Sequence, residues 1–130
     1  MLEKGALLFR GLDAVIKDNT MFSNLIDFIG TKFPYTAGFA TRKEIPNAPG
    51  VAPASDDPPE TTIEPHLEMS YTKQMPGKIL FYCNSAPTCD GGQTPICDMR
   101  KVYKDMVQFK QLLQPLFMDG LHYSRFDRYQ

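Results

Sequence analysis

The sequence predicts a single α+β domain that is mainly β, with most of its strands after residue 60. The chain has 130 residues, which is at most one domain. Hydrophobic residues make up 42% and charged residues 22%, as in ordinary globular proteins, so the chain is expected to fold. Proline, with 11 residues, is frequent for so short a chain, and it favours turns and extended segments over a helical bundle.

Charge and cysteine content exclude several classes of protein. Lys and Arg total 14 and Asp and Glu 15, a net charge of −1, so no basic nucleic-acid interface or polybasic membrane surface is expected. No apolar run approaches the length of a membrane span, and the first apolar stretch is too short for a signal peptide. Cys83, Cys89 and Cys97 lack C-x-x-C spacing, so we expect small buried thiols in a reducing, cytoplasmic compartment rather than disulfides.

An amphipathic helix is predicted from about Thr20 to Lys32. Its apolar side chains recur at i, i+3, i+4, i+7 and i+11, which places them on one helical face: Phe22, Leu25, Ile26, Ile29 and Phe33. Asn19 or Thr20 is expected to cap its start, and Pro34 to prevent its continuation. Before this helix, the apolar residues 6–9 lie between glycines and predict a short buried strand.

Three later segments are predicted to be strands. Residues 78–83 are rich in aromatic and apolar side chains and are bounded by Pro-Gly and Asn-Ser pairs. Residues 93–97 follow a glycine turn at Gly91 and Gly92. Residues 121–126 form the last predicted strand, close to the end of the sequence.

Two further helical stripes precede that last strand. Asp98 is expected to cap a helix over residues 99–107, where apolar side chains recur at helical spacing. Residues 109–117 carry a second stripe, in which Pro115 is expected to break or kink the helix. Gly120 is expected to end it.

Residues 46–65 form a loop of unusual composition. Prolines and acidic residues are concentrated there: Pro46, Pro49, Pro53, Pro58, Pro59, Pro65, Asp56, Asp57, Glu60 and Glu64. This composition favours a surface linker. The alternative is a long loop that folds over a site and positions the residues that follow it.

The residues with the clearest chemical potential are His66 and Glu68. In a strand, residues i and i+2 point to the same side, so an imidazole and a carboxylate would face one way. Together they are two-thirds of the 2-His-1-carboxylate facial triad, which holds Fe(II) and leaves coordination positions open. An isolated H-x-E is common by chance, and its ordinary interpretation is an exposed His and Glu on a strand edge.

A second candidate is Thr94, which follows the glycine turn. A hydroxyl just after a tight glycine turn could bind a carboxylate. The alternative is a plain β-turn followed by a threonine, a residue type that favours strands.

The order of these segments resembles the N-terminal half of a TauD/TfdA-type, clavaminate synthase-like Fe(II)/2-oxoglutarate oxygenase. The resemblance covers nearly the whole chain, and the ordered set is far more specific than an H-x-E alone. It is carried by Gly5–Gly11, the amphipathic helix, Pro58–Glu60, His66–Tyr71, Pro76–Cys83, Gly91–Ile96 and Asp98–Tyr103.

The resemblance implies a partial double-stranded β-helix, or jelly roll, with flanking helices. It also implies that His66 and Glu68 are iron ligands, and that Thr94 helps to bind the carboxylate of 2-oxoglutarate. In such enzymes the co-substrate is oxidatively decarboxylated, and a small-molecule substrate usually gains a hydroxyl group.

The main departures of the chain from this family concern two residues. The second iron-binding histidine and the arginine that pairs with 2-oxoglutarate lie in the C-terminal half of such proteins, so the sequence is expected to be a truncated, incomplete enzyme. His122, Arg125 and Arg128 do not match those positions. Two alternatives remain. One is a non-catalytic derivative that acts as an interaction module or has no activity. The other is a chain that self-associates through uncovered sheet edges, so that a partner supplies the missing half.

Overall fold

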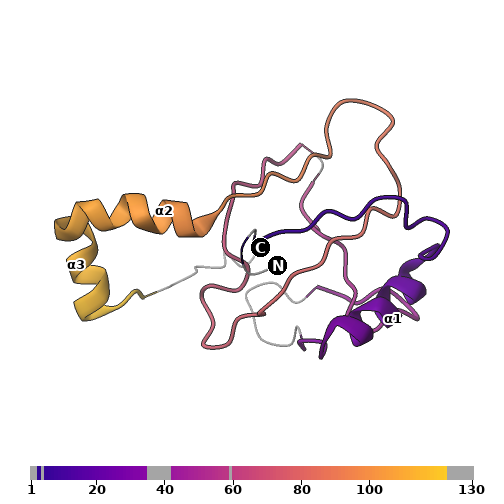
Figure 1. The fold of residues 1–130 in the computed structure, drawn as a ribbon, viewed down its shortest axis with the longest axis horizontal. Helices are drawn as coiled ribbons and strands as arrows, with labels where there is room; N and C mark the ends of the chain where they lie inside the picture. The colour runs from indigo at the N-terminus through magenta and orange to yellow at the C-terminus, as the bar shows by residue number, and fades with distance from the viewer. Residues whose placement is uncertain (1–2, 4, 35–41, 59, 123–130) are drawn as a thin grey trace, which may run out of the picture. The chain divides into compact units, whose positions relative to one another are not determined.

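A computed structural model describes residue 3 and residues 5–34, 42–58 and 60–122. Their regular elements are α1 (Asn19–Ile29), α2 (Met99–Met106), the 3-10 helix η1 (Val107–Phe109) and α3 (Lys110–Asp119), as labelled in Figure 1. The chain divides into two compact units, Met1–Thr94 and Pro95–Gln130, called unit 1 and unit 2 below. No helix in the described ranges is both long enough and apolar enough to cross a membrane.

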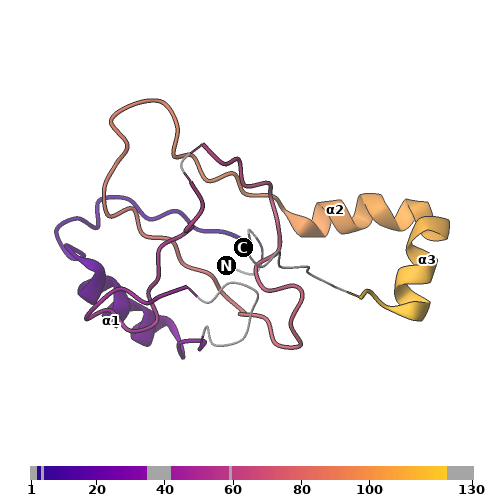
Figure 2. The same ribbon diagram turned by 180° about the vertical axis from the view of Figure 1, so that it is seen from behind.

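The prediction of a mainly β jelly roll is wrong, because the described residues contain no β-strand. Residues 6–9, 78–83 and 93–97 run as irregular backbone, without arrows in Figures 1 and 2. Aromatic and β-branched side chains favour an extended backbone, but a strand also needs a neighbouring segment that completes its hydrogen bonds. In this part of the chain, the backbone bonds outside the helices close turns and caps instead.

The last predicted strand, at 121–126, falls largely outside the described residues. Leu121 and His122 belong to no strand, and residues 123–126 are not described.

The first predicted helix is confirmed as α1, with different ends. The side chain of Asp18, rather than that of Asn19 or Thr20, accepts the backbone N–H of Met21 at 2.8 Å and caps the helix. At the other end, the Gly30 N–H donates to the carbonyl of Ile26 at 2.9 Å, and the helix stops at Ile29. The helix therefore ends before Lys32, and Pro34 is not the residue that stops it.

The apolar face of α1 builds the core of unit 1. Phe22 is buried with Ile16, Ala48 and Val51, and further apolar side chains pack against them: Leu25, Ile26, Ile45, Leu80 and Tyr82. The rings of Phe22 and Tyr82 stack with their centroids 5.1 Å apart. The Tyr82 hydroxyl also donates to the Ile16 carbonyl at 3.4 Å, so residues far apart in the sequence meet on this helix.

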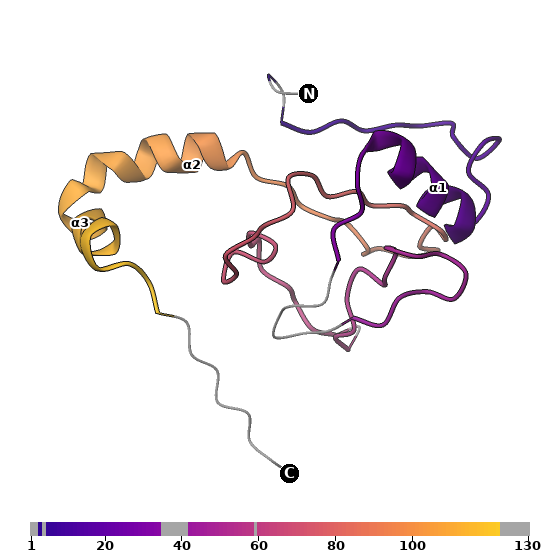
Figure 3. The ribbon, with the colours of Figure 1, turned by 90° about the horizontal axis from the view of Figure 1, so that it is seen from below.

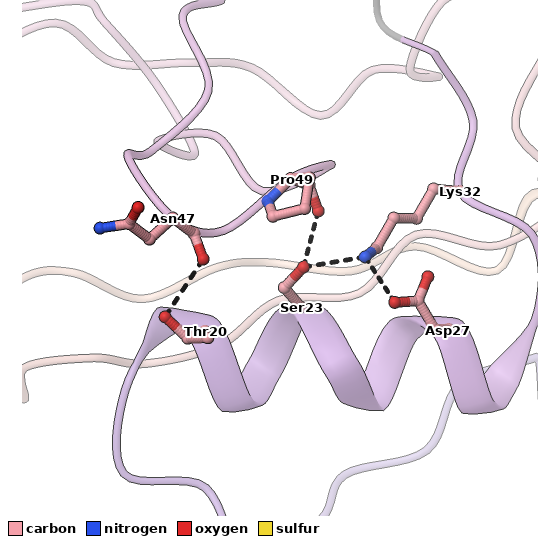
Figure 4. A network of polar contacts seen from close by, with 6 residues as sticks. All are labelled: Thr20, Ser23, Asp27, Lys32, Asn47 and Pro49. Carbon is pink, nitrogen blue, oxygen red and sulfur yellow. Dashed lines mark hydrogen bonds and ion pairs between the residues drawn. The ribbon is translucent and has the colours of Figure 1, made fainter.

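The beginning of the proline-rich loop is part of this core, so the interpretation of 46–65 as a surface linker is wrong there. The Ile45 N–H donates to the Val51 carbonyl at 2.8 Å and closes a tight turn. From α1, the hydroxyl of Thr20 donates to the Asn47 carbonyl at 3.2 Å (Figure 4). Prolines restrict the backbone of this turn, and the helix supplies the hydrogen bonds that hold it in place.

A second set of contacts ties the same turn to the C-terminal side of α1. Ser23 is 1% exposed and donates its hydroxyl to the Pro49 carbonyl at 2.7 Å. The ammonium of Lys32 donates to Ser23 Oγ at 2.9 Å and pairs with the Asp27 carboxylate at 2.7 Å (Figure 4). These two hydrogen bonds, one donated and one accepted, offset the cost of burying the hydroxyl.

In unit 2, the cap predicted at Asp98 is confirmed. Its carboxylate accepts the Arg100 backbone N–H at 3.0 Å and two side-chain bonds from the same residue, at 2.9 Å each. The side-chain hydrogen bonds of Arg100 lower the pKa of the Asp98 carboxyl from 3.8 to about 2. This end of α2 is therefore held by local contacts within three residues.

The two predicted stripes of unit 2 become separate helices, and Pro115 does not break the second of them. The change of direction falls at η1, and Pro115 lies inside the continuous helix α3 (Figure 3). Proline leaves the carbonyl four residues earlier, that of Gln111, without its helical donor. Gln111 is exposed, so water can take that role. Gly120 follows the last residue of α3, as predicted.

The three cysteines are exposed rather than buried, contrary to expectation. Cys83 and Cys89 lie in irregular backbone of unit 1, and Cys97 directly precedes the cap of α2. Their small apolar side chains would have suited a sheet core, which the described residues do not form.

Candidate functional site

His66 and Glu68 lie side by side in unit 1. The His66 Nε2 atom is 3.4 Å from Glu68 Oε2. The imidazole side chain is 55% exposed and the carboxylate side chain 20% exposed, so solvent reaches both groups. The pair stands on irregular backbone rather than in a sheet, yet the two side chains still face one another, as the i, i+2 spacing predicts.

A backbone carbonyl orients the His66 ring. Its Nδ1 atom lies 2.8 Å from the carbonyl oxygen of Glu64. Because a carbonyl oxygen can only accept, a hydrogen bond between these two atoms requires the proton on Nδ1. In the neutral ring, Nε2 then presents a lone pair toward Glu68, which is the form of histidine that binds a metal.

A tight turn holds the residue that follows the carboxylate. Met69 has a φ of 56° and is buried, although non-glycine residues seldom adopt this conformation. The Thr72 N–H donates to the Met69 carbonyl at 3.0 Å, and the Thr72 hydroxyl donates to it at 2.8 Å. A buried side chain and two hydrogen bonds thus keep the backbone after Glu68 in a conformation that it would seldom adopt otherwise.

This pair fits two positions of an iron site. Ligand atoms at right angles, each about 2.1 Å from a metal, lie about 3 Å apart, close to the separation of Nε2 and Oε2. A cation placed between the Nε2 lone pair and the carboxylate oxygen would be attracted by both atoms. No group of three or more His, Cys, Asp and Glu side chains able to hold a metal is found within the described ranges.

An open cleft in unit 1 borders the carboxylate. It has a volume of about 640 Å³ and is lined by the end of α1, residues 50–54 and residues 76–82, together with Glu68. Two lysines on its wall are already engaged. Lys32 contacts Ser23 and Asp27, and Lys78 donates to the Ile29 carbonyl at the end of α1, at 3.3 Å. The rest of the cleft is mostly apolar, and its wall also carries Arg42 and the carboxylates of Glu44 and Glu68.

Thr94 is not joined to this pair by a hydrogen bond among the described residues. It is exposed and stands at the end of unit 1, two residues after Gly92. Gly91 and Gly92 have φ values of 119° and 73°, so the predicted glycine turn has the backbone that glycine permits. Its role toward a carboxylate stays a prediction.

Sequence reasoning missed the contacts that orient the pair. The relevant signal is the Glu64–Pro65 step, because a residue before proline is restricted to extended backbone and its carbonyl direction is correspondingly limited. The left-handed conformation of Met69 has no comparable signal, since methionine is not a residue type that favours it.

Comparison with known proteins agrees with the order of motifs. The family described as taurine catabolism dioxygenase TauD, TfdA family, matches residues 1–126. A clavaminate synthase-like protein of Arabidopsis thaliana is 35% identical over 125 residues, which are 95% of this chain and 36% of that protein. The dapdiamide synthesis protein DdaC of Enterobacter agglomerans is 39% identical over 101 residues, 77% of this chain and 29% of that protein. The chain thus spans about a third of the length of these relatives. No solved structure matches it.

Proposed function

Because this chain belongs to the TauD/TfdA dioxygenase family, we propose that it is the N-terminal portion of an Fe(II)/2-oxoglutarate-dependent oxygenase. His66 and Glu68 are two of its iron ligands. The observation that carries the proposal is the 3.4 Å approach of Nε2 and Oε2 across an H-x-E segment. A third ligand and the whole protein's activity belong to the longer protein, as in relatives about three times the length of this chain.

Each residue has a defined task in this proposal. His66 offers the Nε2 lone pair, and Glu68 offers a carboxylate oxygen from the wall of the cleft. Thr94 donates its hydroxyl to the carboxylate of 2-oxoglutarate. When bound, Fe(II) with this co-substrate supplies oxidising power from O₂, and a small organic substrate is hydroxylated. The apolar surface of the cleft next to Glu68 would contact the organic substrate.

Anaerobic calorimetric titration of the chain with Fe(II), with and without 2-oxoglutarate, tests this proposal. We expect binding that strengthens when 2-oxoglutarate is present. His66→Ala and Glu68→Gln should each weaken Fe(II) binding by at least about tenfold, because even partners outside the ligand shell are worth that much.

Two matched variants control for the loss of a histidine or of a charge. His122→Ala removes the other histidine, and Glu64→Gln removes an exposed carboxylate while keeping the backbone carbonyl that faces His66. Both should bind Fe(II) as the wild type does. Equal binding by all five proteins would refute the iron site and favour the alternative, a non-catalytic derivative of the family.

A further inference from the structure

We propose that the Glu64–Pro65 step is a positioning element that selects the metal-binding tautomer of His66 before any metal arrives. The inference deepens the proposed function and rests on it, since it assigns a role to residues around the same two ligands. Glu64 acts through its backbone carbonyl, and Pro65 acts by restricting the direction of that carbonyl.

The geometry of the step supports this role. The Glu64 carbonyl belongs to the peptide bond that ends at the Pro65 nitrogen, and it accepts from His66 Nδ1 at 2.8 Å. The proline ring holds its own φ near −65° and excludes the helical region for the residue before it. Only Pro65 separates the acceptor from the imidazole, so these restrictions bear directly on the hydrogen bond.

The tautomer decides whether the pair can take up a metal. With the proton on Nδ1, the Nε2 lone pair points at the space beside Glu68 Oε2. With the proton on Nε2 instead, the ring would donate to Glu68, and no lone pair would be available there. A carbonyl that holds the first form therefore removes a rearrangement from metal binding and raises the basicity of the ligand.

Nothing else in this part of the chain contacts Nδ1 in the same way. The imidazole is more than half exposed, so packing alone does not orient it. Its recorded polar contacts are the Glu64 carbonyl on one nitrogen and the Glu68 carboxylate on the other. The two contacts involve different nitrogens of the ring. When the proton of the neutral ring is held on Nδ1, the Nε2 lone pair is left to face Glu68.

Long-range ¹H–¹⁵N correlation spectra of the metal-free, ¹⁵N-histidine-labelled chain test this directly. The spectra are recorded near pH 8.5, and the ¹⁵N chemical shifts report directly whether each ring is neutral. His66 should carry its proton on Nδ1. His122 is the only other histidine and provides an internal reference for an exposed ring.

Variants then separate the proline from its surroundings. Pro65→Ala should shift His66 toward the tautomer ratio of His122 and weaken Fe(II) binding about 10- to 100-fold. Pro58→Ala removes another exposed proline of the same loop. It should change neither the tautomer ratio of His66 nor the affinity for Fe(II).

A wild-type His66 with the same tautomer ratio as His122 would overturn the inference, whether or not iron binds. This comparison of His66 with His122 uses only the wild type, so it tests the inference even if Pro65→Ala does not fold. A retained Nδ1 proton in folded Pro65→Ala would also overturn it. Absence of Fe(II) binding in a wild type whose His66 is protonated on Nδ1 would instead refute the proposed function, so the two failures are distinguishable.

Discussion

Two amphipathic helices of this chain, α1 and α3, show the same kind of sequence pattern and have opposite surroundings. Phe22 of α1 is 7% exposed and packs against Tyr82, whereas Phe117 of α3 is 70% exposed. In α3, Leu113 is the buried apolar residue, and other members of the stripe lie at the surface: Leu112, Leu116 and Phe117. The difference teaches that apolar periodicity predicts a helix but does not reveal whether its apolar face has a partner.

The two units also differ in what holds their helices. In unit 1, the loop at Asn47 and Pro49 accepts hydrogen bonds from Thr20 and Ser23 of α1. The ring of Phe22 stacks separately on Tyr82. In unit 2, α2 begins at a cap made by neighbouring residues, Asp98 and Arg100. Tertiary packing should therefore dominate the stability of unit 1, and local contacts that of α2.

Among the variants that test this difference, Phe22→Ala should lower the free energy of unfolding most. Phe22→Ala removes a buried ring from the centre of the small core and should lower the free energy of unfolding by about 3 to 5 kcal/mol. Amide hydrogen exchange across α1 would measure the loss. Phe28→Ala is the matched control, since Phe28 lies on the same helix and is 91% exposed. Similar losses in both variants would contradict the assignment of the buried face.

Substitution of Gly50 should have an intermediate effect on unit 1. Gly50 has a φ of +76°, and an added Cβ would lie 2.8 Å from Lys32 Cδ, so the lysine that bridges Ser23 and Asp27 must shift. Gly50→Ala should cost about 1 to 2 kcal/mol, from the left-handed backbone alone.

Gly30→Ala is the corresponding control, because Gly30 has extended backbone with open space around its Cα. Urea unfolding followed by circular dichroism compares the two variants. A loss for Gly30→Ala as large as that for Gly50→Ala would show that position 50 has no special constraint.

The stability of the α2 cap should depend on pH, because it rests on the charge of Asp98 rather than on buried contacts. Hydrogen bonds from the Arg100 side chain lower the pKa of Asp98 to about 2, so its contribution is complete above 3.8 and is lost as the pH falls toward 2. Helicity of α2 should therefore persist at pH 4 and decline between pH 3.8 and 2, as read from backbone chemical shifts. Asp98→Asn should abolish this decline, and an unchanged pH profile in that variant would argue against the cap.

Truncation of the exposed α3 stripe should have the smallest effect. Phe117→Ala removes a ring that is mostly in solvent and should change the free energy of unfolding by less than about 0.5 kcal/mol. Thermal unfolding followed at a helical wavelength measures the change. A loss approaching that of Phe22→Ala would mean that the α3 face is covered in solution.

Sequence patterns predicted the helices well and the strands wrongly, for one reason. A helix completes its hydrogen bonds within its own segment, so the spacing around Phe22 and the cap at Asp98 are sufficient evidence. A strand such as residues 78–83 depends on a second segment, and no pattern within those residues identifies one. The same limit applies to the loop at 46–51. Its prolines indicate irregular backbone, but no pattern in the sequence shows that Ala48 and Val51 of this loop are buried.

For the candidate site, the i, i+2 spacing was enough to place His66 and Glu68 on one side, since this depends only on an extended backbone. The orientation of the imidazole was not predictable, because it depends on which atom accepts from Nδ1. The connection of Glu68 to a cleft was not predictable either, since α1 and residues 76–82 come together only in the folded chain.

The sequence by itself determined the family, the helical segments with the cap at Asp98, and the shared side of His66 and Glu68. Each of these depends on residue types and spacings that act over a few positions. The tertiary structure alone decided that the loop from Ile45 to Val51 packs on α1 while the α3 stripe stays exposed. Burial depends on which distant surfaces meet, and distant contacts are set by the folded chain as a whole.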